Sequence, residues 1–479
     1  VIDTPVIQPD VRDAAAALDS PVGLEAGGAD AEPGDALGAT CPAILSYAKQ
    51  IPVTSIAGLA LDGNGNQYLA ATMFNTVDFG LGNMTSAGSA DLVMFKLNAT
   101  DGSALWAHNF GDSQDQVAVG AAVSHSGQMA AIGNFTGVMT VGNAISNSSS
   151  TALDFVVATN NSGTGLWARS VNTQAGALFA IAGNPARDEF VVCGYTTGTV
   201  TDLGISGSHG SDGMEDILIA KLSSATGATL WARQIGSDGT QLCSALAMDA
   251  AGNVIASGTY NGSPDLGLGA LPTLASSVQA VWVAKFDGAS GATLISKAYG
   301  NTGKQTVRGV AVDSDGNVAV TGSMKLTLAF GAYSLTSAGS TDGYLVKLDS
   351  SLTPLWAKRW GDAGAQESHG VAFNSMGDIV VVGQVKGSAV FDSTTLTSNG
   401  TAAYDAYWAK FAADGSTLCA AIYGDSANQG GDIVAISSSA VGAQKDKVNL
   451  VGYATGTIDF GAGISLTSLS SRGFLLQTN

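Results

Sequence analysis

Short runs of alternating apolar and small or polar residues, separated by turns rich in Gly, Asn and Asp, make up most of the chain. The clearest unit begins at Val307 with VRGVAVDSDGNVAVTGS, continues through LAFGAYSLTSAGSTDGYLVKLD and ends near Ser368, after PLWAKRWGDAG. Alternation with a period of two, bounded by such turns, is typical of antiparallel strands joined by hairpins. The unit therefore predicts four strands, and the 3.6-residue period of helices is absent from it.

The same pattern begins again at six other places, which are Ile56, Val117, Leu178, Cys243, His369 and Asp432. The Trp of the LWA-like strand gives one reference position in each unit, which we call the ruler. Its equivalents are Trp106, Trp167, Trp231, Ile295, Trp356 and Cys419. These positions are spaced by 61, 64, 64, 61 and 63 residues. Repeats of four antiparallel strands at this period are typical of propeller blades. We predict an all-β, seven-bladed β-propeller of four-stranded antiparallel blades, with blades at about 56–116, 117–177, 178–242, 243–306, 307–368, 369–431 and 432–479.

The seventh unit ends without a fourth strand, since its third strand, around Gly473, is followed by the last residue, Asn479. A segment that resembles the missing strand lies at the other end of the chain, at residues 43–51, AILSYAKQI. Its Tyr47 lies 59 residues before Trp106, in register with the ruler. We predict that residues 43–51 close blade seven, which removes an exposed sheet edge. The propeller domain is then 43–479, preceded by an extension or linker at 1–42.

This repeat resembles the bacterial extracellular β-propeller repeat of the SBBP type, and more loosely the NHL repeat, over roughly residues 43–479. The resemblance implies the propeller fold. It is uninformative about function, because such propellers resemble one another across many roles.

Composition and charge point to a protein that works outside the cell. The net charge is −19, which would repel a phosphate backbone and argues against nucleic-acid partners. No apolar run approaches the roughly 18–20 residues of a membrane helix. The first residue, Val1, fits a mature form whose signal peptide has been removed. We predict an extracellular or cell-surface protein, secreted and without a transmembrane segment.

The four cysteines allow two disulfides. Cys419 takes the ruler position of blade six and Cys41 precedes the closing strand of the adjacent blade seven. Cys193 ends the second strand of blade three, and Cys243 opens the first strand of blade four at the same face. We predict the pairs Cys41–Cys419 and Cys193–Cys243, with four buried free thiols as the alternative.

The N-terminal extension carries a small apolar segment with Val1, Ile2, Val6 and Ile7 before an acidic stretch rich in Gly and Ala. One interpretation is a spacer. The other is an assembly element that docks on an adjacent copy and gives a head-to-tail, filament-like homopolymer.

Recurrent polar residues are interpreted as parts of the blades. The turns at Asp62, Asp249 and Asp313 resemble calcium loops but lack the later Glu, which favours hairpin turns. Asp91, Asp154, Asp216, Asp342 and Asp405 recur just before the third strand in nearly every blade and are expected to anchor loops. The recurrent Trp is expected to pack between blades. Lys96, Lys221, Lys285, Lys347 and Lys410 are expected on a solvated strand face.

No nucleophile elbow, P-loop or zinc-protease motif is present, and the four His are scattered along the chain. An enzyme on a propeller would gather unique His, Arg or acidic residues at the channel mouth, whereas these loops hold Ser, Thr, Gly and Ala. We predict no catalytic residue, no metal site and no cofactor. The leading hypothesis is a non-enzymatic structural or adhesive scaffold that associates with itself or the cell envelope. A carbohydrate-binding propeller is the alternative, and a secreted hydrolase or lyase ranks third.

Overall fold

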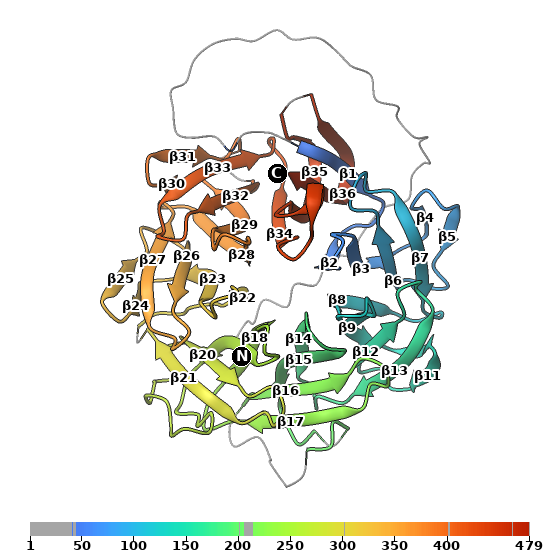
Figure 1. The fold of residues 1–479 in the computed structure, drawn as a ribbon, viewed down its shortest axis with the longest axis horizontal. Helices are drawn as coiled ribbons and strands as arrows, with labels where there is room; N and C mark the ends of the chain where they lie inside the picture. Colours follow the sequence, from blue (N-terminus) through green and yellow to red (C-terminus); the bar gives the residue numbers. More distant parts are fainter. Residues whose placement is uncertain are drawn as a thin grey trace. The chain divides into compact units, whose positions relative to one another are not determined.

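The computed structural model describes residue 41 and residues 45–200, 202–205, 214–300, 302–400, 403–461 and 463–478. Within these residues the chain is built from strands, and the single helical segment is one 3₁₀ turn, η1 (Gly442–Gln444). Seven four-stranded antiparallel sheets follow one another around a ring (Figure 1). The predicted seven-bladed β-propeller is therefore confirmed.

The first strand of each blade lies innermost in the ring and the fourth lies outermost (Figure 1). The strands of blades one to six, in this order, are β2 (Ile56–Leu61), β3 (Gln67–Met73), β6 (Asp91–Leu97) and β7 (Ala104–Phe110); β8 (Gln116–Val123), β9 (Met129–Phe135), β12 (Leu153–Thr159) and β13 (Gly165–Val171); β14 (Ala177–Gly183), β15 (Glu189–Thr196), β16 (Asp216–Ser223) and β17 (Thr229–Ile235); β18 (Gln241–Met248), β19 (Val254–Tyr260), β20 (Ala280–Phe286) and β21 (Thr293–Tyr299); β22 (Gly309–Val312), β23 (Val318–Met324), β26 (Asp342–Leu348) and β27 (Pro354–Trp360); β28 (Ala365–Phe373), β29 (Ile379–Lys386), β32 (Asp405–Phe411) and β33 (Thr417–Tyr423).

Four blades carry an additional two-stranded hairpin between their second and third strands. These hairpins are β4 (Thr76–Asp78) with β5 (Asn83–Thr85), β10 (Gly137–Val141) with β11 (Asn143–Asn147), β24 (Thr327–Phe330) with β25 (Tyr333–Thr336), and β30 (Ser388–Phe391) with β31 (Thr394–Thr397).

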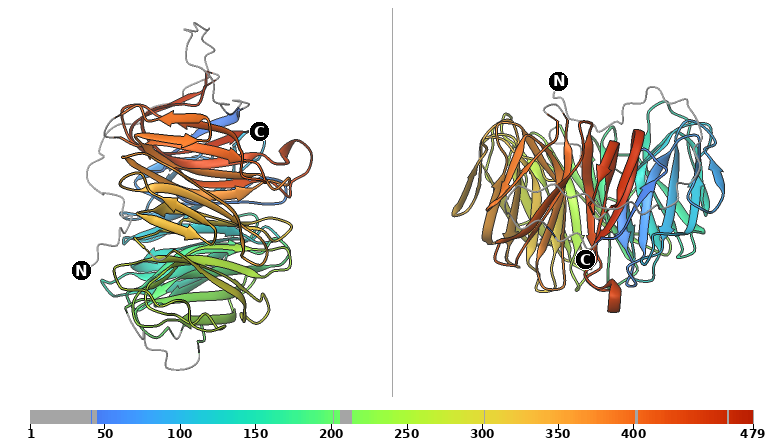
Figure 2. Two further views of the ribbon diagram at one scale, coloured as in Figure 1. Left: turned by 90° about the vertical axis from the view of Figure 1, so that its left-hand side faces the viewer. Right: turned by 90° about the horizontal axis from the view of Figure 1, so that it is seen from above.

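Blade seven is completed by a strand from near the N-terminus, as predicted. Its sheet has the order β1 (Leu45–Ile51), β36 (Ser465–Thr478), β35 (Val448–Asp459) and β34 (Gln429–Ile436). The antiparallel register pairs Tyr47 with Gln477 and Ile51 with Gly473. Figure 2 shows this last blade, in red, beside the first blade, in blue. The ring is thus closed by backbone hydrogen bonds between the two ends of the domain.

The hydrophobic core consists of seven clusters, each shared by two adjacent blades of the described chain. The recurrent Trp of the outer strand joins neighbours as expected. The Trp106 indole donates a hydrogen bond to the Asn161 carbonyl of the next blade at 2.9 Å, and Trp167 donates to Ser224 in the same way at 2.7 Å. Tyr47 takes the equivalent place in blade seven, where its ring lies against Gly102 of blade one. The spacing of the ruler therefore reflects contacts between blades.

The recurrent lysines do not lie on a solvated face, so that expectation is wrong. Lys96, Lys221 and Lys347 are buried. Lys96 forms an ion pair with Asp62 in the first turn of its own blade at 3.1 Å, and equivalent pairs are Lys221–Glu189, Lys285–Asp249 and Lys410–Asp378. Packing of each blade against the next covers these side chains, and a buried ammonium group requires a carboxylate or carbonyl partner.

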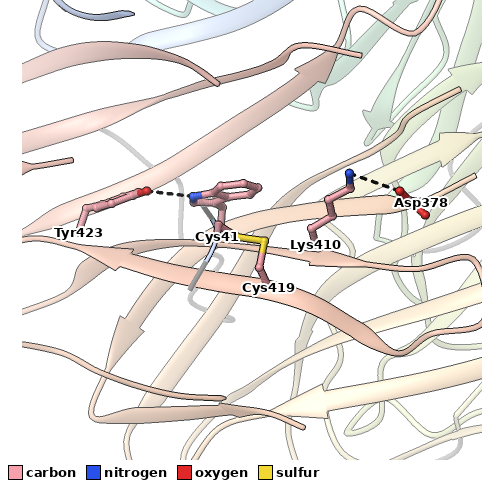
Figure 3. Close-up of a disulfide and its surroundings, with 6 residues drawn as sticks. Cys41, Asp378, Lys410, Cys419 and Tyr423 are labelled. Carbon is pink, nitrogen blue, oxygen red and sulfur yellow. Dashed lines mark hydrogen bonds and ion pairs between the residues drawn. A yellow bond between two sulfur atoms is a disulfide. The ribbon is translucent and has the colours of Figure 1, made fainter. Parts of the chain in front are cut away.

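Both expected disulfides are present. Cys41 is bonded to Cys419 of β33, which ties the segment before β1 to blade six (Figure 3). Cys193 of β15 is bonded to Cys243 of β18, which joins blades three and four. Lys410 and Asp378 lie near the first disulfide and form one of the recurrent ion pairs (Figure 3).

No helix among the described residues has the length and apolar character needed to cross a membrane. The proposed assembly residues, Val1, Ile2, Val6 and Ile7, lie outside the described residues, as does the rest of segment 1–40.

Candidate functional site at the propeller axis

The first strand of every blade contains one extra residue, a β-bulge. The register of the first two strands shifts between Ile56 and Gly58 in blade one, and at the equivalent place in blades two, three, four, six and seven. In blade five, the pairs Gln305–Met324 and Gly309–Thr321 enclose three residues on the first strand and two on the second. A bulge takes its extra residue out of the ladder and re-aims that side chain.

A glycine on the second strand makes room for each bulge in blades two to seven. A Cβ atom at these glycines would lie 1.9–2.1 Å from the carbonyl oxygen two residues before the bulge, far inside van der Waals contact. The glycines are Gly133, Gly194, Gly258, Gly322, Gly383 and Gly452. Blade one has Ala71 at this position. The recurrent glycine of the NVAVTG-like strand thus has a steric role, which is to admit the bulged backbone.

We call the bulged residues the axial ring, because the first strands lie innermost in the propeller (Figure 1). In blade order they are Ala57, Val119, Phe179, Ser244, Arg308, His369 and Asp432. Blades one to four contribute uncharged side chains, which form the uncharged arc. Blades five to seven contribute three ionisable side chains, which form the charged arc.

His369 is the centre of an ion network in the charged arc. Its Nε2 lies 3.3 Å from the Glu367 carboxylate, and its Nδ1 lies 3.0 Å from the Gly431 carbonyl and 3.4 Å from the Asp432 carboxylate. Because both ring nitrogens face acceptors, the imidazole carries two protons. Burial alone would lower the pKa of His369, but hydrogen bonds to Asp432 and Glu367 outweigh it and raise the pKa to about 9.

Glu367 is held as a carboxylate by the same contacts. Its hydrogen bond with His369 lowers its pKa, and the positive charge of Arg308 acts in the same direction. The Gln384 amide also donates to Glu367 at 3.3 Å, while the Tyr453 hydroxyl donates to Gln384 at 3.1 Å. Burial, followed by the negative charges of Asp432 and Glu367, raises the pKa of Tyr453 to about 12, so its hydroxyl stays protonated. The network spans two blades and is fixed from both.

Arg308 differs from the rest of the network because its guanidinium is exposed and makes no side-chain hydrogen bond to a described residue. Other arginines of the blades already donate hydrogen bonds to neighbouring groups. Arg169 donates to the Gly227 carbonyl, Arg233 to the Gly291 carbonyl, and Arg359 to the Asp342 carboxylate. Arg308 thus presents a cation with unused donors beside the network.

The uncharged arc exposes an aromatic ring. Phe179 retains 40% of its surface exposed, although it lies on an innermost strand, and its ring is 5.3 Å from that of Tyr195. Leu242, two residues before the bulge of blade four, is half-buried. The two arcs therefore offer different chemistry around one axis.

The arrangement favours recognition over metal binding. Among the described residues, no group of three or more His, Cys, Asp or Glu side chains has a geometry that could hold a metal ion. At the axis itself, both nitrogens of His369 already face acceptors, so neither has a lone pair to offer.

Of the residues singled out in the sequence, the recurrent aspartates anchor loops as expected. The Asp91 carboxylate accepts hydrogen bonds from the Ala87 amide and the Asn109 side chain, and Asp342 accepts from the Ala338 amide. The charged arc was not identified from the sequence, because unique polar residues were expected in the loops at the channel mouth. These residues lie at the bulges of the first strands instead, where each blade carries a different residue.

Comparisons with known proteins do not assign this chain to a family. No protein-family model matches the chain. The regulatory protein FlaEY of Caulobacter vibrioides is 31% identical over 136 residues, which are 28% of this chain and 14% of that protein, so most of FlaEY has no counterpart here. Among solved structures, the Dos1 propeller is similar with a TM-score of 0.45 and 9% identity, over 90% of this chain and 93% of that one. The quinohemoprotein alcohol dehydrogenase ADHIIG of Pseudomonas putida HK5 has a TM-score of 0.43 and 11% identity, over 91% and 76% of the two chains.

The predicted role of a non-enzymatic structural or adhesive scaffold is corrected by these findings. Similar solved structures include a dehydrogenase, so the likeness does not favour a scaffold over an enzyme. The prediction also assumed that unique polar residues are missing at the axis, and the charged arc shows that they are present. At this identity and TM-score the likeness assigns no dehydrogenase activity to the chain.

Proposed function

We propose that this propeller binds a small molecule at the axial ring, with the charged arc of blades five to seven as the recognition site. One observation carries the proposal. Seven equivalent bulges hold seven different residues, and the ionisable ones are gathered in three consecutive blades. A residue needed for the blade itself would recur, as the Trp and the paired Lys do.

The fold does not require charge at this position. Blades one to four form the same bulge with Ala57, Val119, Phe179 and Ser244. Taking charged groups out of water costs free energy that an apolar residue of similar size avoids. An ion network where the repeat accepts alanine or valine is therefore explained by recognition.

The proposal is a binding role, and no reaction is assigned to the site. A general base needs a free lone pair near neutral pH. His369 has none, because Glu367 and the carbonyl of Gly431 occupy both nitrogens. The network instead offers fixed donors and acceptors, which suits the orientation of a polar ligand.

We further propose that the protein works in an oxidising compartment, secreted or periplasmic. Two disulfides support this, because such bonds form and persist outside the reducing cytosol. Membership of the SBBP-type repeat family also remains a proposal, supported by the 61–64-residue repeat.

Ligand-observed NMR with a panel of acidic, basic and neutral fragments tests the site. We compare the wild type with a variant carrying Arg308→Ser and His369→Ser, and with a control carrying Val119→Ser at the equivalent bulge of blade two. A subset of fragments should lose its signal in the first variant and keep it in the control. If every binding fragment behaves alike in all three proteins, the axial ring is not the site.

A second measurement needs no variant, and so remains decisive should the double substitution unfold the protein. Hydrogen exchange of the wild type with a bound fragment should slow at residues 305–310, 366–372 and 429–434. Protection confined to the outer strands would contradict the proposal.

A further inference from the structure

The end of blade five at which its first strand begins is basic, although the chain as a whole carries a net charge of −19. Residues 302–308 lead into β22 and residues 323–326 end and follow β23 at the same end of the blade, where Gln305 pairs with Met324. They include Lys304, Arg308 and Lys325, and no acidic residue. An anionic group approaching this end therefore meets a local excess of positive charge.

Arg308 is the group best placed to hold such an anion. Its guanidinium is exposed, and Glu367, the carboxylate on which its charge acts, already accepts hydrogen bonds from His369 and Gln384. A planar guanidinium with free donors matches a carboxylate through two parallel hydrogen bonds.

The neighbouring positions of the axial ring are suited to an apolar group. Ser244 of blade four follows Arg308 around the ring, and Phe179 of blade three follows Ser244. Phe179 has 40% of its surface exposed on an innermost strand, where a ligand could cover it. Burial of exposed apolar surface stabilises a complex by about 25 cal/mol for each Å² covered.

Building on the proposed function, we infer that the ligand is a small carboxylic acid with an apolar body. Its carboxylate binds Arg308, and its body extends across blade four to Phe179. The ion network of Glu367, His369 and Asp432 forms the other side of Arg308 and favours an acid that also carries a hydroxyl or amino group.

Isothermal titration of the full-length protein tests this class with three probes: 3-phenylpropionate, its neutral amide 3-phenylpropionamide, and acetate. The acid should bind at least tenfold more tightly than the amide, which lacks the charge, and than acetate, which lacks the body. Arg308→Gln should remove the advantage of the acid over the amide. Phe179→Ala should weaken the acid and the amide alike, and Val119→Ala should change neither.

The titrations distinguish a wrong ligand class from a wrong binding site. If the amide binds as tightly as the acid, and Phe179→Ala weakens both, the site stands and the class is wrong. If 3-phenylpropionate shows no saturable binding to the wild type, the class is likewise overturned. If binding is unchanged in both Arg308→Gln and Phe179→Ala, the axial site itself is wrong.

Discussion

The two arcs of the axial ring share one backbone and differ in side chains. In the uncharged arc, Val119 and Phe179 occupy bulges that are built like those of Arg308 and His369 in the charged arc. The bulge is thus a property of the repeat, permitted by a glycine on the second strand, while the residue it presents varies freely. The difference separates what the fold needs from what recognition needs, and each prediction below tests that separation.

The largest effect on the free energy of unfolding is expected from removing the disulfides. Each arc contains one of them. Cys41–Cys419 bonds residues 378 apart in sequence beside the charged arc, and Cys193–Cys243 bonds residues 50 apart in the uncharged arc. The loop-entropy model gives about 6 kcal/mol for the first and about 4 kcal/mol for the second. Denaturant unfolding of the two double Cys→Ser variants measures this order. Equal losses would contradict the expected dependence on the length of the closed loop.

The glycine opposite the bulge should matter equally in both arcs for stability. Gly383→Ala places a Cβ 2.0 Å from the Glu367 carbonyl, and Gly133→Ala in blade two places one 2.0 Å from the Val117 carbonyl. Each should lose about 3 kcal/mol of unfolding free energy, because backbone must shift. Only Gly383→Ala should also weaken 3-phenylpropionate, since it displaces Glu367. Equal loss of binding in the two variants would erase the distinction between the arcs.

His369 should make stability depend on pH in the charged arc. Its pKa is raised from 6.5 to about 9 in the folded protein. Its contribution is therefore complete below pH 6.5 and is lost as the pH rises through 9. Relative to His369→Gln, the wild type should lose about 2 kcal/mol of unfolding free energy across this window, with the partial exposure of its partners allowed for. Urea unfolding at several pH values measures the difference, and parallel curves for the two proteins would refute the ion network.

The smallest effects on stability are expected at Arg308 and Ser244. Arg308→Ala removes an exposed side chain without hydrogen bonds to described residues, and Ser244→Ala changes the equivalent bulge of blade four. Both should stay within about 0.5 kcal/mol of the wild type in thermal unfolding. A large loss for Arg308→Ala would show that this residue serves the fold, and the argument for recognition would fail.

The propeller, its closing strand and its cysteine pairs follow from the sequence because they belong to the repeat. Seven copies of one pattern average out local irregularity, and the missing strand of blade seven is matched by Tyr47 at the spacing of the ruler. The recurrent lysines were misplaced because a strand pattern indicates which residues alternate, and it does not show that the next blade covers both faces. Lys221 is fully buried for this reason.

The candidate site could not be predicted from the repeat because it consists of the differences between repeats. A bulge adds one residue to a strand and interrupts its period of two. The alternation of apolar and polar residues therefore does not show which way the side chains of His369 and Asp432 point. The recurrent Gly383-type glycine is the signal that could have found the bulge. Counting 14 residues back from that glycine reaches Arg308 from Gly322 and His369 from Gly383, whereas Asp432 lies 20 residues before Gly452 because the first hairpin of blade seven is longer.

The position of a bound acid tests the account most directly. A crystal structure of the wild type with 3-phenylpropionate at saturating concentration should show the carboxylate within hydrogen-bonding distance of the Arg308 guanidinium and the phenyl ring against Phe179. An acid bound at the outer strands, or an axis left without it at that concentration, would contradict the assignment of the charged arc to ligand recognition.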